Sequence, residues 1–277
     1  MGRQSTQVSA LNCIDISNSD INQSVRLLKQ ACLDSGFFYV VNHGISQEFM
    51  DEVFAQSKKF FSLPLEEKMK IIRNEKHRGY TPVLDELLDP ENQLHGDYKE
   101  GYYIGVEKGE DDPESKKPFY GQNRWPAPDV LPGWRETMEK FHGETLYVLL
   151  MPKIFGEPIA ILRLLRYEGI VRDILVKKYC NTNVESHKFR TSTTWSLCLV
   201  QLQRKKLTWL YSSMFNEGQI SDPSKGIYGA GAHTDFGVIT LLATDDVSGL
   251  QICKNRDAKP QIWEDVAPLK GLVHMSL

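Results

Sequence analysis

At 277 residues the chain exceeds the usual size of a single domain, yet a large β-rich domain can reach this length undivided. Hydrophobic residues at 41% and charged residues at 25% lie near globular averages, which argues against intrinsically disordered and membrane-embedded proteins. A net charge of -3 offers no basic surface for nucleic acid, so we expect a small-molecule substrate as the partner.

The first ten residues, MGRQSTQVSA, lack the apolar core of a secretory signal, and no apolar run approaches the length of a membrane-spanning helix. The five cysteines contain no CxxC pair, which suits reduced thiols better than disulfides or structural zinc. We therefore expect a cytoplasmic protein that acts as a monomer and does not associate with membranes.

Helix, strand and helix follow one another after this N-terminus. Residues 21–34 place apolar side chains at helical spacing, and Gly36 acts as a stop signal. The next stretch, GFFYVVNHGI, is aromatic and β-branched and ends in a turn-forming run, which predicts a buried strand and makes His43 a turn residue. Ser46 starts a second helix that continues to Pro64, and LPLEEKMKI opens a further short helix.

The rest of the chain is richer in strands. Residues 78–132 hold many Gly, Pro and acidic residues and predict loops around edge strands, with one strand-like piece at GYYIG. A helix is expected over 134–151, and strands are expected over 159–167, 238–243 and 250–253. The stretch of about 170–219 shows no sustained period and stays unassigned. Without regular strand-helix alternation, a doubly wound fold is excluded.

A His-x-Asp pair is the strongest chemical signal in the sequence. In a strand, side chains two residues apart share a face, so His233 and Asp235 could direct an imidazole and a carboxylate at one metal ion. Two rival pairs are weaker. His95 and Asp97 lie in a polar stretch, and His142 and Glu144 lie in an expected helix, where such spacing does not share a face.

The surroundings of His233 favour the first pair. The segment HTDFGVITLLAT runs directly into an apolar, β-branched strand, and metal sites need such rigid elements. The approach GIYGAGAH is rich in Gly and Ala, which lets the backbone come close to a bound ligand. One His and one carboxylate supply two ligands, whereas the facial triad that binds non-haem Fe(II) needs a second His.

Longer motifs carry a family resemblance. GFFYVVNHGI, FFSLPLEEKMKI, RGYTP and NRWP, followed by RLLRYEG and ISDPSKGIYGAGAHTDFGVITLLATDDVSGLQI, resemble the plant-type iron(II)/2-oxoglutarate-dependent dioxygenases, which include isopenicillin N synthase. The likeness covers most of residues 11–169 and 220–271. It implies an oxidoreductase that uses Fe(II) and O2 to couple decarboxylation of 2-oxoglutarate to oxidation of a small organic substrate, and it allows ascorbate as a further cofactor.

The resemblance also implies a fold and a site. The fold would be α+β and β-rich: a double-stranded β-helix, or jelly roll, with N-terminal helices. The N-terminal helix and strand region of the family would cover 1–135, and a partial jelly-roll domain would cover 136–277. His233 and Asp235 would be two of three iron ligands. Tyr167 matches a tyrosine that contacts 2-oxoglutarate in relatives, while Leu165 stands where the family has Asn.

Three departures from the family pattern accompany this likeness. Residues 236–277 contain no Arg-x-Ser, which grips 2-oxoglutarate in relatives, and His274 is the only histidine there; we expect it to be solvated. The region 141–152 looks short, and 170–219 looks inserted. Together they predict an aberrant, C-terminally truncated member with an incomplete barrel. A non-catalytic protein that binds a ligand or partner, and a different cupin-like metal protein, remain as alternatives.

Overall fold

The computed structural model describes residues 11–148, 159–170, 191–199, 226–235, 239–245, 247, 249–253, 258, 261–269 and 273–276. For residues 168–170, 191–199 and 273–276 the backbone alone is described. Within these ranges, no helix is both long and apolar enough to cross a membrane.

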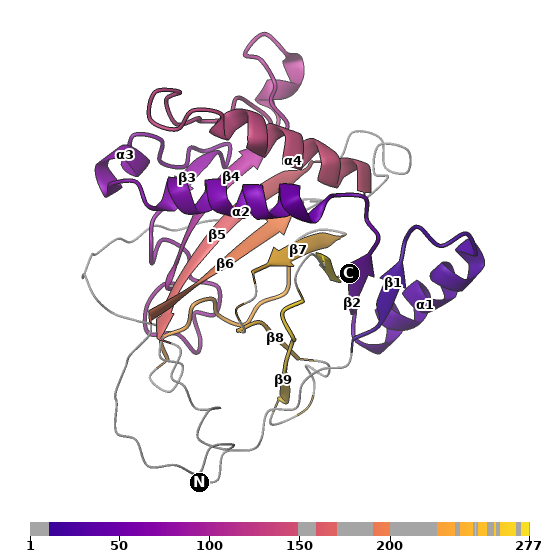
Figure 1. Cartoon of the computed structure of the whole chain (residues 1–277). Helices are drawn as coiled ribbons and strands as arrows, with labels where there is room; N and C mark the ends of the chain where they lie inside the picture. Colours follow the sequence, from indigo (N-terminus) through magenta and orange to yellow (C-terminus); the bar gives the residue numbers. More distant parts are fainter. Residues whose placement is uncertain are drawn as a thin grey trace, which may run out of the picture.

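Helices dominate the first half of the chain and strands the second (Figure 1). The elements in chain order are β1 (Cys13–Asp15), α1 (Ile21–Asp34), β2 (Phe37–Val41), α2 (Gln47–Phe61), α3 (Leu65–Met69), β3 (Gly79–Thr81), β4 (Lys99–Gly105), the 3-10 helix η1 (Pro113–Lys116), α4 (Trp134–Val148), β5 (Ile161–Ile170), β6 (Thr191–Leu199), β7 (Thr240–Thr244), β8 (Gln251–Cys253), β9 (Trp263–Asp265) and β10 (Val273–Ser276).

The first helices begin and end where the sequence predicts. Asp20 caps α1 by accepting a hydrogen bond from the Gln23 amide, and Gly36 follows the helix with a positive φ of 77°. Ser46 caps α2 in the same way, through the Phe49 amide. In both helices a side-chain oxygen satisfies an amide that the first turn leaves without a carbonyl partner. Local chemistry therefore sets these boundaries.

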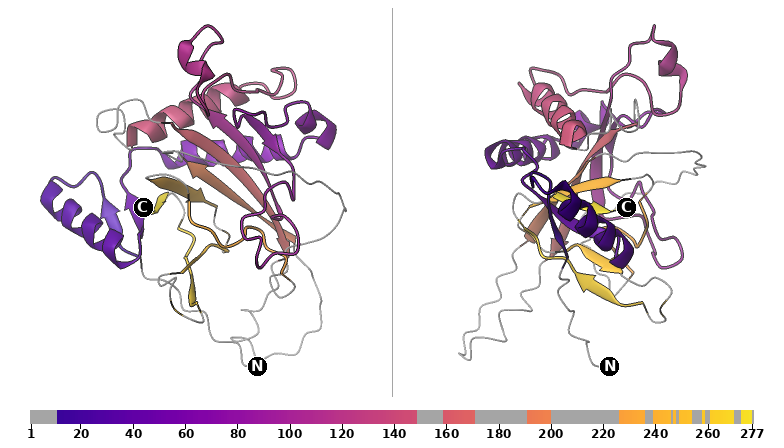
Figure 2. Two further views of the ribbon diagram at one scale, coloured as in Figure 1. Left: turned by 180° about the vertical axis from the view of Figure 1, so that it is seen from behind. Right: turned by 90° about the vertical axis from the view of Figure 1, so that its right-hand side faces the viewer.

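Strands from both ends of the chain meet in one sheet. Its order is β1-β2-β10-β7-β6-β5-β4-β3; only β1 and β2 pair in parallel, and the other neighbours are antiparallel. In the described part of the chain this sheet ends at β1 and β3, and β8 and β9 form a second, two-stranded sheet. The two views in Figure 2 show α1 and β1 lying beside one end of the large sheet.

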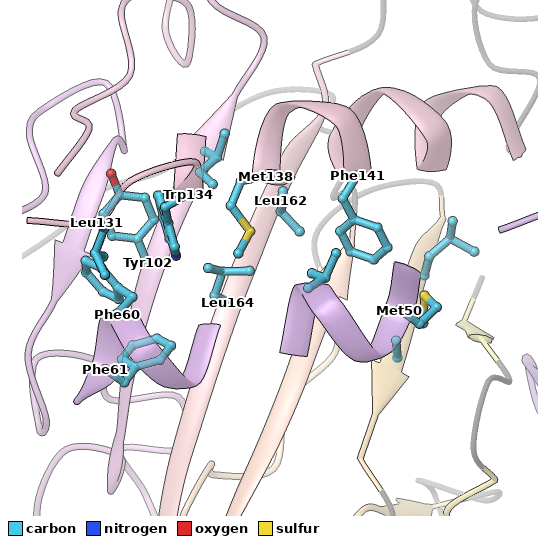
Figure 3. Packing of buried hydrophobic residues seen from close by; sticks show 14 of the residues in the cluster. Met50, Phe60, Phe61, Tyr102, Leu131, Trp134, Met138, Phe141, Leu162 and Leu164 are labelled. Atoms are coloured by element: carbon cyan, nitrogen blue, oxygen red, sulfur yellow. The ribbon is translucent and has the colours of Figure 1, made fainter. Parts of the chain in front are cut away.

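The main core lies between the large sheet and the helices α2 and α4 (Figure 3). Phe60 and Trp134, one from each helix, pack against Tyr102 of β4 with ring centroids 4.7 and 5.1 Å away. Leu164 of β5 and Ala243 of β7 belong to the same cluster. Burying these aromatic and aliphatic surfaces is the main contribution that holds the helices on the sheet.

The opposite face of β4 and β5 is polar. Because side chains alternate along a strand, Tyr102 and Leu164 face the helices while Lys99 and Tyr103 of β4 and Arg163 of β5 face away from them. Their surroundings are nonetheless buried: Lys99 is only 5% exposed. This second face of the sheet is where the candidate site lies.

Several strands differ from the sequence prediction. β7 begins at Thr240, two residues after the expected start of the 238–243 strand, and β5 extends to Ile170. β6 falls inside the stretch of about 170–219 that received no assignment, and it pairs with β5 and β7. The remainder of that stretch, residues 171–190 and 200–219, lies outside the described residues, as do residues 149–151 of the expected fourth helix.

Candidate metal centre

His233 and Asp235 lie next to each other at the polar face of the sheet. The Nε2 atom of His233 is 3.3 Å from Oδ1 of Asp235, and each side chain is about one-third exposed (36% and 34%). The prediction that they share a strand face is wrong, because residues 231–235 are irregular backbone that precedes β7. A direct ion-pair contact, and not strand periodicity, brings the two groups together.

The pair is electrostatically coupled. Burial lowers the pKa of His233, but hydrogen bonds to the Asp235 carboxylate and the Gly231 carbonyl outweigh it and raise that pKa above its ordinary value. Burial raises the pKa of Asp235, but hydrogen bonds from His233 and the Thr240 hydroxyl bring it below its ordinary value. Asp235 is therefore ionised near neutral pH, which is the form that a metal cation requires.

The other nitrogen of the His233 ring has its own partner. Nδ1 lies 2.8 Å from the carbonyl oxygen of Gly231, and only a protonated Nδ1 can donate to that oxygen. In the neutral imidazole this leaves the lone pair on Nε2, the nitrogen that faces Asp235. When a metal replaces the Nε2 proton that Asp235 otherwise accepts, the Gly231 carbonyl still holds the Nδ1 proton, so the Nε2 lone pair is available to the metal.

The glycine-rich segment that precedes His233, residues 226–232, runs beside residues 93–98. The Leu94 amide donates to the carbonyl of Gly226 (3.4 Å), and the Tyr98 amide donates to the carbonyl of Tyr228 (2.9 Å). Further along, the Gly231 amide donates to Oδ1 of Asp97 (3.0 Å). These contacts join two segments that are at least 130 residues apart in the sequence.

The rival pairs are not metal sites in the structure. His95 is exposed, whereas Asp97 is fully buried and forms an ion pair with Lys99, so the two do not act together. His142 is buried in α4, while Glu144 is partly exposed and lies 3.8 Å from Lys140. His43 accepts a hydrogen bond from the Ile45 amide within its turn, as expected for a turn residue.

Tyr167, the residue proposed to contact 2-oxoglutarate, lies near the same approach segment. A Cβ atom on Gly229 would be 3.2 Å from Cδ1 of the Tyr167 ring, so the absence of a side chain at Gly229 lets the backbone pass this close. Tyr167 pairs with Lys99 across β4 and β5. Leu165, two residues earlier and 6% exposed, has the same strand orientation.

A compensated cluster of charges lies beneath the site. Glu86 contacts Lys99 (3.1 Å) and Arg163 (2.8 Å), and it accepts a hydrogen bond from the Tyr103 hydroxyl. Burial raises the pKa of Glu86, but the two cations reverse this and hold it well below its ordinary value. Each buried cation therefore has an ionised carboxylate partner, as buried charges require.

The described residues supply two metal-binding side chains at this place. Among them, no group of three or more His, Cys, Asp or Glu side chains could hold a metal ion. The backbone of His274 lies in β10, where it pairs with Tyr39 of β2 and Leu242 of β7. Its backbone thus lies at a central-strand position and not in a loose tail.

Sequence reasoning missed two residues that bear on the pair. Thr240 hydrogen bonds to Asp235, and Asp97 holds the Gly231 amide. The one signal for Asp97 in the sequence, its spacing from His95, pointed to the wrong partner. No local pattern could have linked it to a loop more than 130 residues away.

Known proteins resemble the chain over most of its length. The model described as "non-haem dioxygenase in morphine synthesis N-terminal" matches residues 11–128, and that of the 2OG-Fe(II) oxygenase superfamily matches residues 198–276. Azadirone synthase of Melia azedarach is 43% identical over 262 residues, which are 94% of this chain and 69% of the relative. Kihadalactone A synthase of Citrus sinensis is 42% identical with the same coverage.

A solved structure shares the fold. A full-length protein of Neurospora crassa, crystallised in complex with alpha-KG, has a TM-score of 0.62 against 99% of this chain and 76% of its own length. Its sequence is 24% identical. The second family match begins at residue 198, inside the stretch that the sequence left unassigned.

Proposed function

Because the chain belongs to the 2OG-Fe(II) oxygenase superfamily, we propose that His233 and Asp235 bind the catalytic Fe(II) through Nε2 and a carboxylate oxygen. The family consists of 2-oxoglutarate-dependent dioxygenases, which use iron and O2 to oxidise a substrate. The observation that carries the assignment is the 3.3 Å contact between the two side chains, with the opposite ring nitrogen held by the Gly231 carbonyl.

The donor set fits Fe(II). Imidazole nitrogen and carboxylate oxygen are the ligand types of the non-haem iron triad, and both groups are accessible from solvent. In the absence of metal, His233 and Asp235 satisfy each other. Binding of a cation between them would replace the proton that they share, and the fixed tautomer would present Nε2 without ring rotation.

When bound, Fe(II) supplies the oxidising chemistry, and the side chains supply orientation and charge. The negative charge of the Asp235 carboxylate offsets the positive charge of the metal. Thr240 holds this carboxylate by a hydrogen bond. We infer that Tyr167 contacts 2-oxoglutarate, because its strand orientation and its proximity to Gly229 place it beside the approach to His233. Lys99 and Arg163 each form an ion pair with the buried carboxylate of Glu86.

The substrate class follows from the family and the charge. We infer a small organic substrate, consistent with relatives whose names describe synthases of azadirone and kihadalactone A. We also infer that the large sheet is one wall of a jelly roll and that β8 and β9 belong to the facing wall, since Tyr39 of β2 packs with Ile252 and Val266 on that side. The division at about residue 135 between N-terminal region and jelly roll stays a prediction.

Turnover of 2-oxoglutarate tests this function. The purified chain, given Fe(II), ascorbate, O2 and 2-oxoglutarate, should release succinate. His233→Ala should abolish this release, and His95→Ala, a substitution of an exposed histidine outside the site, should leave it unchanged. Succinate release by the wild type no faster than by His233→Ala would favour a family member that binds a ligand without turnover.

A further inference from the structure

Asp97 is a buried carboxylate whose side chain has three partners in the described part of the chain. Its side chain is fully buried, and its Oδ2 atom forms an ion pair with Lys99. Its Oδ1 atom accepts a hydrogen bond from the Gln93 side-chain amide (2.8 Å) and another from the Gly231 backbone amide (3.0 Å). The two oxygens of the carboxylate thus have separate roles, because one neutralises a cation and the other holds backbone and side-chain amides.

The residue held by Asp97 is the residue that orients His233. The amide of Gly231 donates to Asp97, while the carbonyl of the same glycine accepts the Nδ1 proton of His233. Both hydrogen bonds engage one residue, so fixing its amide also restricts where its carbonyl can point. The chain of contacts runs from Lys99 through Asp97 and Gly231 to the imidazole ring.

Close packing confirms that this loop is seated on the segment that carries Asp97. A Cβ atom on Gly231 would lie 2.2 Å from Oε1 of Gln93 and 2.9 Å from Cβ of Asp89. Gln93 is itself fixed, because its Oε1 accepts a hydrogen bond from the Asp89 amide (2.7 Å). Only glycine fits at this distance, so the backbone at residue 231 has little room to move.

We propose that Asp97 is a positioning residue for the metal ligand His233, acting through the Gly231 backbone. This role rests on the proposed function in one respect, namely that His233 binds the metal. Groups that orient a ligating histidine through its second nitrogen commonly change metal affinity by about 10- to 100-fold when they are removed. Here the orienting carbonyl is main chain, and Asp97 is the side chain that keeps it in place.

An isosteric substitution separates the two roles of the carboxylate. In Asp97→Asn one acceptor oxygen remains, and the Lys99 ammonium and the Gly231 amide compete for it. The ammonium wins this competition, because hydrogen bonds from charged donors are the stronger ones. Gly231 is then expected to lose its acceptor, and Co(II), used as a stable probe for Fe(II), should bind about 10- to 100-fold more weakly.

Glu100 of β4, three residues after Asp97, offers a matched control. It is 3% exposed and contacts Lys68 (2.8 Å) and Arg166 (2.6 Å), but it lies on the opposite face of β4 from Lys99. Glu100→Gln should lower thermal stability to a similar degree as Asp97→Asn while leaving the affinity for Co(II) within about twofold of the wild type. A purely structural role for Asp97 would make the two variants alike in both measurements.

A variant without the Lys99 ammonium tests whether this ammonium competes with the Gly231 amide. In Lys99→Met the competing ammonium is gone, and Glu86 keeps its contact with Arg163. The single side-chain oxygen that Asp97→Asn leaves is then free for Gly231, so adding this substitution to Lys99→Met should weaken Co(II) binding less than about twofold. The effect of Asp97→Asn on Co(II) affinity is compared with and without Lys99. Any direct effect of the lysine charge on the metal cancels, because it is the same on both sides of each comparison.

Amide hydrogen exchange at Gly231, followed by NMR in the metal-free protein, reports the positioning role independently of metal binding. Faster exchange in Asp97→Asn but not in Glu100→Gln or in the double variant supports the role. Unchanged exchange or unchanged Co(II) affinity in a folded Asp97→Asn protein overturns it, as does an equal loss of affinity in Glu100→Gln. Failure of the wild type to bind Co(II) would instead refute the proposed function. The rate of amide exchange at Gly231 would then still test whether Asp97 holds the Gly231 amide.

Discussion

Two buried tyrosines on neighbouring strands differ in a single hydrogen bond. Tyr80 of β3 and Tyr102 of β4 are paired in register, and both are at most 1% exposed. The hydroxyl of Tyr80 donates to Glu100 (2.6 Å), whereas that of Tyr102 has no partner among the described residues. Burial raises the pKa of Tyr102, so this unpaired hydroxyl stays neutral.

The two corresponding phenylalanine variants should shift stability in opposite directions. Tyr80→Phe removes a bond to a charged acceptor and should lower the free energy of unfolding by about 1–3 kcal/mol. Tyr102→Phe removes a desolvated, unpaired hydroxyl and should leave that free energy unchanged or raise it by up to about 1 kcal/mol. Urea denaturation of both variants measures the difference, and equal losses would show that the Tyr102 hydroxyl has a partner.

His142 should make the protein less stable in mild acid. Burial, together with the positive charge of Arg78, lowers its pKa to about 4 from the ordinary 6.5. Between these pH values the unfolded chain takes up a proton that the folded chain excludes. The stabilisation is therefore complete above pH 6.5 and is lost as the pH falls toward 4, by about 3 kcal/mol.

Replacement of this histidine tests that dependence. His142→Gln should flatten the fall of the unfolding free energy between pH 6.5 and 4, measured by denaturant titrations at several pH values. His95→Gln, at an exposed position, should retain the wild-type slope. Identical slopes in His142→Gln and the wild type would mean that His142 titrates normally in the folded protein.

At the residue level, the sequence singled out His233 and Asp235, which the structure brings into contact, but it did not indicate the residues that hold them. His233 and Asp235 are recognisable by residue type and spacing, because metal chemistry restricts which side chains can serve. Asp97 has no such signature: its importance comes from one backbone amide brought to it by folding. The apolar strand expected after His233 is present as β7, but the pair itself lies in irregular backbone before that strand.

At the level of secondary-structure elements, Phe60 of α2 is one of the side chains that join the helices to the sheet. It is fully buried, and its ring lies 4.7 Å from Tyr102, 5.2 Å from Trp134, 5.1 Å from Phe61 and 6.1 Å from Tyr80. Removing it would leave a cavity among four rigid aromatic rings, which cannot collapse easily into the space.

Phe60→Ala should therefore lower the free energy of unfolding by about 3–5 kcal/mol, measured by urea denaturation. Leu33→Ala, at a position 73% exposed on α1, should change it by less than about 0.5 kcal/mol. A loss below about 1 kcal/mol in Phe60→Ala would contradict the view that α2 is held on the sheet through this residue.

Helices were easier to predict than strands because their signals are local. The bounds of α1 match the expected range of 21–34, and the capping residue Ser46 precedes α2 as expected. Short strands such as β1 and β3, with three residues each, carry too little pattern to be recognised alone. They form because a neighbouring strand supplies hydrogen-bond partners, which no window of sequence contains.

For the whole molecule, distant segments build both the sheet and the site. β2, near the N-terminus, pairs with β10 over residues 273–276, and the loop at 226–235 rests on residues 93–98. These pairings close large loops and are invisible to local analysis. The family resemblance supplied what local patterns could not, namely the use of iron and 2-oxoglutarate and the expectation of a jelly roll.

Metal titration of the full chain tests the central claim, that His233 and Asp235 bind the metal, most directly. The wild type should bind one equivalent of Co(II), and His233→Ala and Asp235→Ala should each weaken binding by more than about 100-fold, since ligands matter more than the groups that orient them. His95→Ala should bind as the wild type does. Unchanged affinity in His233→Ala would contradict the account.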